Sequence, residues 1–153
     1  MNAFRGVQPA IVALLCSGCV SAALPGGGAE LPAEVARFTS LMNAHRASIG
    51  CPSLEWDERI AMVAQSHSED MVTRRFRTHD DPEGRSPGDR LDGAGIVWSA
   101  WAENIAWDLP TGDAVLNSWL GSPEHAANLE NCSFTNHGVG LHREHWTHVF
   151  VRR

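Results

Sequence analysis

Histidine is the residue type with the most obvious chemical use in this chain. The 153 residues include 8 histidines and 6 tryptophans but no lysine and no tyrosine, and His125, His137, His142, His145 and His148 crowd the C-terminal part. An imidazole can bind a divalent metal ion, exchange a proton near neutral pH, or form hydrogen bonds. These histidines therefore predict either a metal or acid–base site or a set of hydrogen-bonded structural side chains.

No short motif in the folded part builds a metal or catalytic centre by itself. The sequence lacks the His-Glu-x-x-His pattern of zinc hydrolases, and Cys51 and Cys132 do not have the spacing of a Cys-x-x-Cys zinc site. Ser122, His125 and Glu103 give a Ser/His/Glu set on paper, but Ser122 lies outside any Gly-x-Ser-x-Gly elbow. Because Ser122 precedes Pro123, we interpret it as a helix cap.

The charge balance excludes some classes of partner. The formal net charge is −6, and all 12 positively charged side chains are arginine. Near neutral pH this argues against a broad basic surface for nucleic acid or anionic lipid. Acidification through a histidine pKa of about 6.5 could reverse the sign of the net charge.

The N-terminal segment has the order of an export signal. Residues 1–23 carry a single charge at Arg5, then an apolar run that is too short to span a bilayer, then small residues suited to cleavage. Cys19 also suggests a lipoprotein signal, with residues 24–30 as a glycine-rich linker. We expect an extracytoplasmic protein, secreted or periplasmic, with anchoring at Cys19 as the alternative.

Cys51 and Cys132 are the cysteines that remain after the signal is set aside. Two thiols in an exported domain usually pair, so we predict a disulfide between them. Two buried free thiols are the alternative.

Residues 31–153 show no repeat and no second composition regime, so they predict one domain. Turn and cap residues favour five helices followed by a hairpin. The expected helices run from Pro32 to near Gly50, from Asp57 through Met71, from Ser86-Pro87, from Thr111 to Gly121, and from Ser122-Pro123. Helices first and a hairpin last predict an α+β fold with helices packed on an antiparallel sheet.

The expected hairpin lies at the C-terminus. Asn136-His137-Gly138 is typical of a turn, and 139–142 and 145–151 are typical of strands joined by a turn at 143–144. On the last strand, Trp146, His148 and Phe150 share one face. Outside the hairpin, His67 lies on an apolar helix face, which favours a buried, hydrogen-bonded histidine over a metal ligand.

Eight segments, in this order and spacing, are similar to those of one known family. They are Asn43-Ala44-His45-Arg46, Leu54-Glu55-Trp56-Asp57, Ala64 to Met71, Thr78-His79, Ala102-Glu103-Asn104-Ile105-Ala106, Trp119 with Ser122 to Leu129, Gly138-Val139-Gly140, and His145 to Phe150. In these segments the chain resembles the CAP superfamily of cysteine-rich secretory proteins, antigen 5 and pathogenesis-related proteins, in its bacterial form. The resemblance implies a three-layer α-β-α sandwich with a central antiparallel sheet over residues 31–153.

The resemblance also implies a cleft lined by two histidines and two acidic residues. Its matching positions here are His79, Glu103 and His145. Ser122 stands where the second acid is expected, and Glu124 and His125 follow closely enough to fill the same space. His148 stands where the family commonly has glutamine, which favours a hydrogen-bonding role.

The expected cleft could hold a zinc ion. Neutral imidazoles of His79, His125 and His145 would be the ligands, with Glu103 ligating or holding a water. The alternative is a polar cleft whose side chains hydrogen-bond one another. Trp98, Trp101 and Trp107 surround Glu103 in the sequence, and they favour core packing over a binding surface.

The resemblance leaves three functions open. We expect a non-enzymatic exported domain that binds a small hydrophobic ligand such as a lipid, an envelope glycan or a protein partner, with or without zinc. One alternative is a metal-dependent hydrolase of peptide or ester bonds that uses Glu103, His79 and His145. The other is an envelope interaction module with a vestigial cleft; no nucleic-acid partner and no transmembrane span are expected.

Overall fold

The computed structural model describes residues 31–153. The predicted signal at 1–23, the lipoprotein cysteine Cys19 and the linker at 24–30 lie outside these residues. The described elements, in chain order, are α1 (Ala33–Ser48), β1 (Glu55–Trp56), α2 (Glu58–Arg74), α3 (Pro87–Gly93), β2 (Ala100–Ala106), α4 (Gly112–Leu120), α5 (Pro123–Leu129), β3 (Asn136–His142) and β4 (His145–Arg152). Within this part of the chain, every helix is too short or too polar to cross a membrane.

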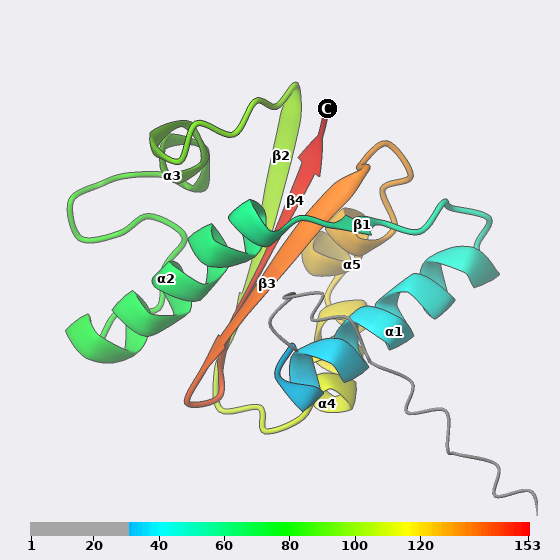
Figure 1. The fold of residues 1–153 in the computed structure, drawn as a ribbon. Coiled ribbons are helices and arrows are strands. Elements are labelled where there is room, and N and C mark those ends of the chain that lie inside the picture. Colours follow the sequence, from blue (N-terminus) through cyan, green and yellow to red (C-terminus); the bar gives the residue numbers. More distant parts are fainter. Residues whose placement is uncertain (1–30) are drawn as a thin grey trace, which may run out of the picture.

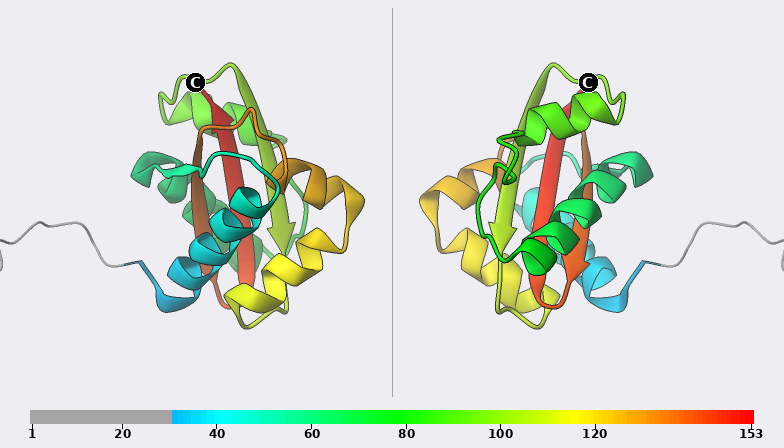
Figure 2. Two further views of the ribbon diagram at one scale, coloured as in Figure 1. Left: turned by 90° about the vertical axis from the view of Figure 1, so that its right-hand side faces the viewer. Right: turned by 90° about the vertical axis from the view of Figure 1, so that its left-hand side faces the viewer.

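The elements form three layers around one sheet. Helices α2 and α3 cover one face, and α1, α4 and α5 cover the other (Figures 1 and 2). The strand order is β1-β3-β4-β2, so β2 is an edge strand. The predicted α+β class and three-layer sandwich are confirmed.

The sheet differs in two details from the prediction. It is mixed rather than purely antiparallel, because the two-residue strand β1 pairs parallel with β3. The predicted turn at Asn136-His137-Gly138 is wrong, because these residues open β3 and pair with β4. The predicted turn at Arg143-Glu144 is confirmed, and both residues have positive φ, as a tight hairpin turn between twisted strands requires.

Three of the expected helix caps are confirmed. Asp57 accepts hydrogen bonds from the first turn of α2, and Thr111 accepts one from Ala114. Ser86 forms a reciprocal capping box with Asp89 at the start of α3. At α5, however, the side chain of Ser122 makes no cap hydrogen bond, so the interpretation of Ser122 as a side-chain cap is wrong.

Strand β4 supplies both halves of the core by alternation. Trp146 and Phe150 pack with α1 and α4 on one face, while Val149 and Val151 pack with α2 and α3 on the other. Helix α2 approaches β3 so closely that a Cβ on Gly140 would lie 2.3 Å from the backbone nitrogen of Gln65. Glycine is therefore required there by contact with the helix.

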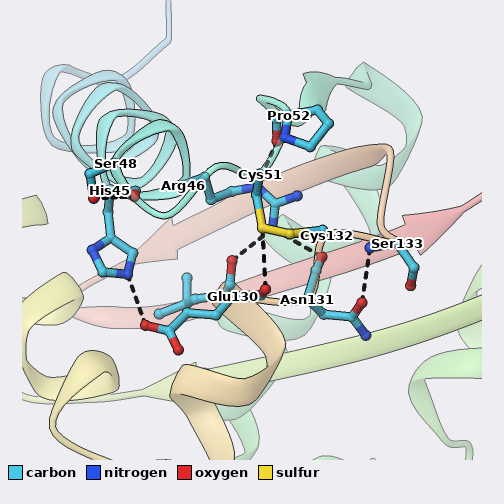
Figure 3. Close-up of a disulfide and its surroundings, with 10 residues drawn as sticks. His45, Arg46, Ser48, Cys51, Pro52, Glu130, Asn131, Cys132 and Ser133 are labelled. Atoms are coloured by element: carbon cyan, nitrogen blue, oxygen red, sulfur yellow. Dashed lines mark hydrogen bonds and ion pairs between the residues drawn. A yellow bond between two sulfur atoms is a disulfide. The ribbon is translucent and has the colours of Figure 1, made fainter.

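A disulfide joins Cys51 and Cys132, which confirms that prediction. It ties the loop after α1 to the loop after α5, and Figure 3 shows the buried side chain of Arg46 beside it. Arg46 donates to the carbonyl oxygens of Leu129 and Asn131 at 2.7 and 3.1 Å. For a loop of 81 residues the chain-entropy stabilisation is roughly 4 kcal/mol.

Candidate functional site

Glu103 is the centre of a charged cluster at the edge strand β2. Its residue exposure is only 6%, and both carboxylate oxygens have partners. Oε1 lies 2.9 Å from Nδ1 of His79, and Oε2 accepts a 2.7 Å hydrogen bond from Nη2 of Arg90. Because each oxygen of this buried carboxylate forms a charge-assisted hydrogen bond, Glu103 fixes the positions of His79 and Arg90.

Arg90 couples α3 and the preceding loop to this strand. Its Nη1 donates to the carbonyl oxygens of His79 and Arg85 at 2.8 and 3.1 Å, while its Nη2 binds Glu103. One guanidinium therefore fixes both the backbone and, through Glu103, the ring of His79. Its planar fork of donors suits this task better than an ammonium group would.

His67 on α2 is the fourth member of the cluster around Glu103. It is buried, its Nε2 donates to the carbonyl oxygen of Thr78 at 3.1 Å, and the same nitrogen lies 4.0 Å from Oε1 of Glu103. The predicted buried, hydrogen-bonded histidine is confirmed. Burial lowers the pKa of His67, so the neutral ring is favoured.

Helix α5 is fastened to the other face of β2. Asn104 donates from Nδ2 to the carbonyl oxygen of His125 at 3.1 Å, and Asn128 donates to Oδ1 of Asn104 at 2.8 Å. The side chain of Ser122 lies 2.9 Å from Nδ1 of His125. The ring of His125 is thereby oriented by the residue that precedes its own helix.

The two histidines that flank β2 have pKa values shifted in opposite directions. The hydrogen bond that Nδ1 of His79 donates to Glu103 raises the pKa of His79. Burial, followed by the charge of His79, lowers the pKa of His125. The site thus pairs a histidine whose pKa is raised with one whose pKa is lowered.

A pocket open to solvent lies beside this cluster, with a volume of about 410 Å³. Its lining residues are His79, Asp80, Pro87, Trp101, Ala102, Glu103 and Asn128. We call it the β2 pocket. Trp101 packs edge to face with Trp98, with ring centroids 6.5 Å apart. Its ring therefore contacts the core on one side and lines the pocket on the other. Trp107 instead lies under the guanidinium of Arg77.

The structure brings together some of the expected cleft residues and separates others. His79 and Glu103 are in direct contact, and Ser122 and His125 form a second pair near them. Glu124 is exposed on α5. His145 lies at the start of β4, bonds through Nδ1 to the carbonyl oxygen of Arg143, and lines a different pocket.

The zinc prediction finds no matching arrangement of side chains. His79, His125 and His145 do not surround one point, since His145 lines another pocket. Within residues 31–153, no group of three or more histidine, cysteine, aspartate or glutamate side chains is placed to hold a metal ion. The residues present do not fit the expected zinc site.

The comparisons with known proteins decide the family. Residues 39–151 match the sequence profile of CAP, the cysteine-rich secretory protein family, over well more than half of the chain. The chain belongs to the CAP family. This CAP chain is 36% identical over 117 residues to the uncharacterized membrane protein YlbC of Bacillus subtilis (strain 168). That alignment covers 76% of the CAP chain and 34% of YlbC.

Solved structures share the fold of this CAP domain. One is an extracellular protein containing a SCP domain from Bacillus anthracis str. Ames, with 36% identity and a TM-score of 0.76; 78% of this chain and 40% of that chain are covered. Another is an outer surface protein from Borrelia burgdorferi, with 22% identity and a TM-score of 0.72; 78% and 92% are covered. Both neighbours are extracellular or surface proteins.

Two members of the cluster in this CAP domain were not predicted as site residues. The sequence gives a reason to expect His67 in a polar cluster, because a histidine on an apolar helix stripe needs a polar partner inside the protein. It gives no such reason for Arg90, because an arginine on a short helix is usually solvated. The sequence also contains the pattern Gly-x-Ser-x-Gly at Gly84–Gly88, which the sequence analysis did not identify. It is not a nucleophile elbow, since Ser86 caps α3.

Proposed function

We propose that this CAP domain is a non-enzymatic, extracytoplasmic binding module whose β2 pocket takes a saccharide of the cell envelope. The observation that carries the proposal is the locking of His79 by Glu103. With Nδ1 held by the carboxylate, the Nε2 edge of this half-exposed ring is left for a ligand. The proposal is supported by two structural neighbours that are an extracellular protein and an outer surface protein.

Binding suits the cluster better than catalysis does. A general base needs a free lone pair within reach of the proton that it removes. The side chain of Glu103 is only 1% exposed and its carboxylate is held by His79 and Arg90, so it is poorly placed to reach a substrate proton. His145, the third residue of the hydrolase alternative, lines a different pocket.

The lining of the β2 pocket favours a hydroxyl-rich ligand over an acyl chain. His79, Asp80 and Asn128 offer donors and acceptors, while Trp101 offers an aromatic face. A sugar ring presents both hydroxyl groups and an apolar face, which matches this combination. An acyl chain would need a longer apolar lining than this pocket provides.

The proposal is tested by titrating the protein with soluble envelope glycan fragments and, separately, with a fatty acid. We expect glycan binding that is weakened about tenfold or more in His79→Ala and Trp101→Ala, because each loses a direct contact. His45→Ala is the matched control, since His45 bonds Glu130 away from the pocket. Absence of glycan binding in the wild type, or equal affinity in all variants, would overturn the proposal.

We further propose that residues 1–23 direct export and that the mature protein is released rather than anchored. The short apolar run and the small residues that follow it support this. Expression of wild type and Cys19→Ser, followed by fractionation and intact-mass measurement, tests it. Equal release of both proteins is expected; membrane association that is lost in Cys19→Ser would instead establish a lipid anchor.

A further inference from the structure

We propose that a second pocket, at the C-terminal end of α2, binds an organic phosphate, meaning a phosphate ester with an apolar substituent. This pocket has a volume of about 530 Å³ and is lined by Met71, Val72, Arg75, Phe76, Arg77 and His145. We call it the hairpin pocket, because His145 is the first residue of β4, which forms a hairpin with β3; Figure 1 shows the two strands. It shares no lining residue with the β2 pocket.

Arg75 is the first observation behind this proposal. It is exposed, it caps α2 in the left-handed conformation with φ of 60°, and its backbone N–H bonds the carbonyl oxygen of Met71. Within residues 31–153 its guanidinium has no ion pair or hydrogen bond, whereas the adjacent Arg74 pairs with Glu83. A free guanidinium at a pocket wall is suited to an oxyanion.

Arg77 places further donors in the same wall, and His145 adds an imidazole whose Nε2 accepts a hydrogen bond when the ring is neutral. Arg77 lies over the ring of Trp107, and its Nη2 forms an exposed 3.3 Å ion pair and a 3.4 Å hydrogen bond with Asp108. Nδ1 of His145 donates to the carbonyl oxygen of Arg143 at 3.0 Å. This bond fixes the ring and leaves Nε2 for a ligand. The lining set contains no acidic side chain.

The C-terminal end of α2 repels an anion less strongly than a helix end with all of its last carbonyl groups unpaired would. The carbonyl oxygen of Met71 accepts the backbone N–H groups of both Arg75 and Phe76. These bonds satisfy one of the carbonyl groups that give a helix C-terminus its negative character. Asp108 compensates part of the charge of Arg77, so the guanidinium of Arg75 is the main positive charge at this pocket.

The remaining lining residues define the rest of the ligand. Met71, Val72 and Phe76 are apolar, and Phe76 is half-buried, with its ring centroid 5.6 Å from that of His67. An inorganic ion would leave this apolar wall in contact with water. A phosphate ester places its charge on the arginines and its substituent on the apolar wall.

The test is a calorimetric and NMR titration with phenyl phosphate, with inorganic phosphate and phenol as comparison ligands. Phenyl phosphate is expected to bind at least several-fold more tightly than either one. We expect a loss of roughly tenfold or more in Arg75→Asn and in Arg77→Gln, because each removes a charged hydrogen bond. Asparagine is chosen at position 75 because it tolerates the left-handed conformation.

Arg37→Gln is the matched control, since it removes the same charge from α1, where Arg37 pairs with Asp113. Thermal melting shows that each variant is folded, so that a loss of binding is a loss of contacts. Equal affinity of Arg75→Asn and Arg37→Gln would overturn the proposal, as would equal affinity of the wild type for phenyl phosphate and inorganic phosphate. Cosedimentation with phosphatidylglycerol vesicles distinguishes a lipid headgroup from a soluble ester as the source.

Discussion

At the scale of single residues, Glu103 controls the proton on His79. The hydrogen bond between them raises the pKa of His79. Glu103→Gln removes the negative charge and keeps the size, so we predict that the pKa of His79 falls in this variant. An NMR titration of the His79 ring measures this directly.

The sign of the stability effect follows from the same shift. A pKa that is raised on folding stabilises the protein below the unfolded value of about 6.5, and this stabilisation is lost as pH rises through the folded value. The stability lost in Glu103→Gln should therefore be larger at pH 6 than at pH 8. Asp113→Asn, which removes a carboxylate on α4, should leave the His79 titration unchanged; an unchanged titration in Glu103→Gln would contradict the prediction.

The sequence predicted part of the site. His79 and Glu103 were placed through the family resemblance, and they are in contact. His145 was placed with them, yet β4 begins there and directs the ring to the hairpin pocket. Contacts such as that of Arg90 with Glu103 depend on how α3 docks against β2, and no local pattern encodes that docking.

At the scale of secondary-structure elements, two helix starts that look alike in sequence should respond differently to alanine. The Thr111 side chain accepts a 3.2 Å hydrogen bond from Ala114, whereas the Ser122 side chain bonds His125 instead of capping. We predict that Thr111→Ala costs about 1 kcal/mol of unfolding free energy and that Ser122→Ala costs clearly less. Urea unfolding of both variants measures the difference; equal losses would contradict it.

The strands were harder to predict than the helices. Helix caps and apolar stripes are local, so α2 and α4 were placed correctly. Strand β2 was missed because Glu103 and Asn104 put buried polar side chains on both of its faces, which breaks the alternation that a strand usually shows. The start of β3 resembles a turn in sequence because Gly138, which allows close contact with α2, cannot be told from a turn glycine by its neighbours.

At the scale of the whole molecule, two buried histidines limit stability in acid. His137 and His148 are fully buried, and Nδ1 of His137 lies 3.1 Å from Nε2 of His148. Burial lowers the pKa of His137 to about 4 and lowers the pKa of His148 as well. The unfolded chain binds protons at these rings from about pH 6.5 downward, while the folded protein does not.

We therefore predict that the free energy of unfolding falls as pH drops from about 6.5 towards 4, with His137 alone contributing about 3 kcal/mol. Urea unfolding across this range measures the slope. His148→Gln keeps a hydrogen-bonding partner for His137 and removes one titrating ring, so its slope should be shallower. His142→Gln makes the same substitution at a half-buried histidine outside this pair and is the comparison variant; a slope in His148→Gln no shallower than that of the wild type would refute the assignment.

The disulfide encloses most of the functional surface within one covalent ring. His67, His79, Arg90, Glu103 and His125 all lie between Cys51 and Cys132, as do the loop at 75–86 and the helices on either side of β2. A single proteolytic cut in that loop would open the ring without releasing a fragment. In an environment rich in proteases, such a nicked molecule would keep both halves of the β2 pocket joined, and it would separate into two pieces only after a reductant and a denaturant were added together.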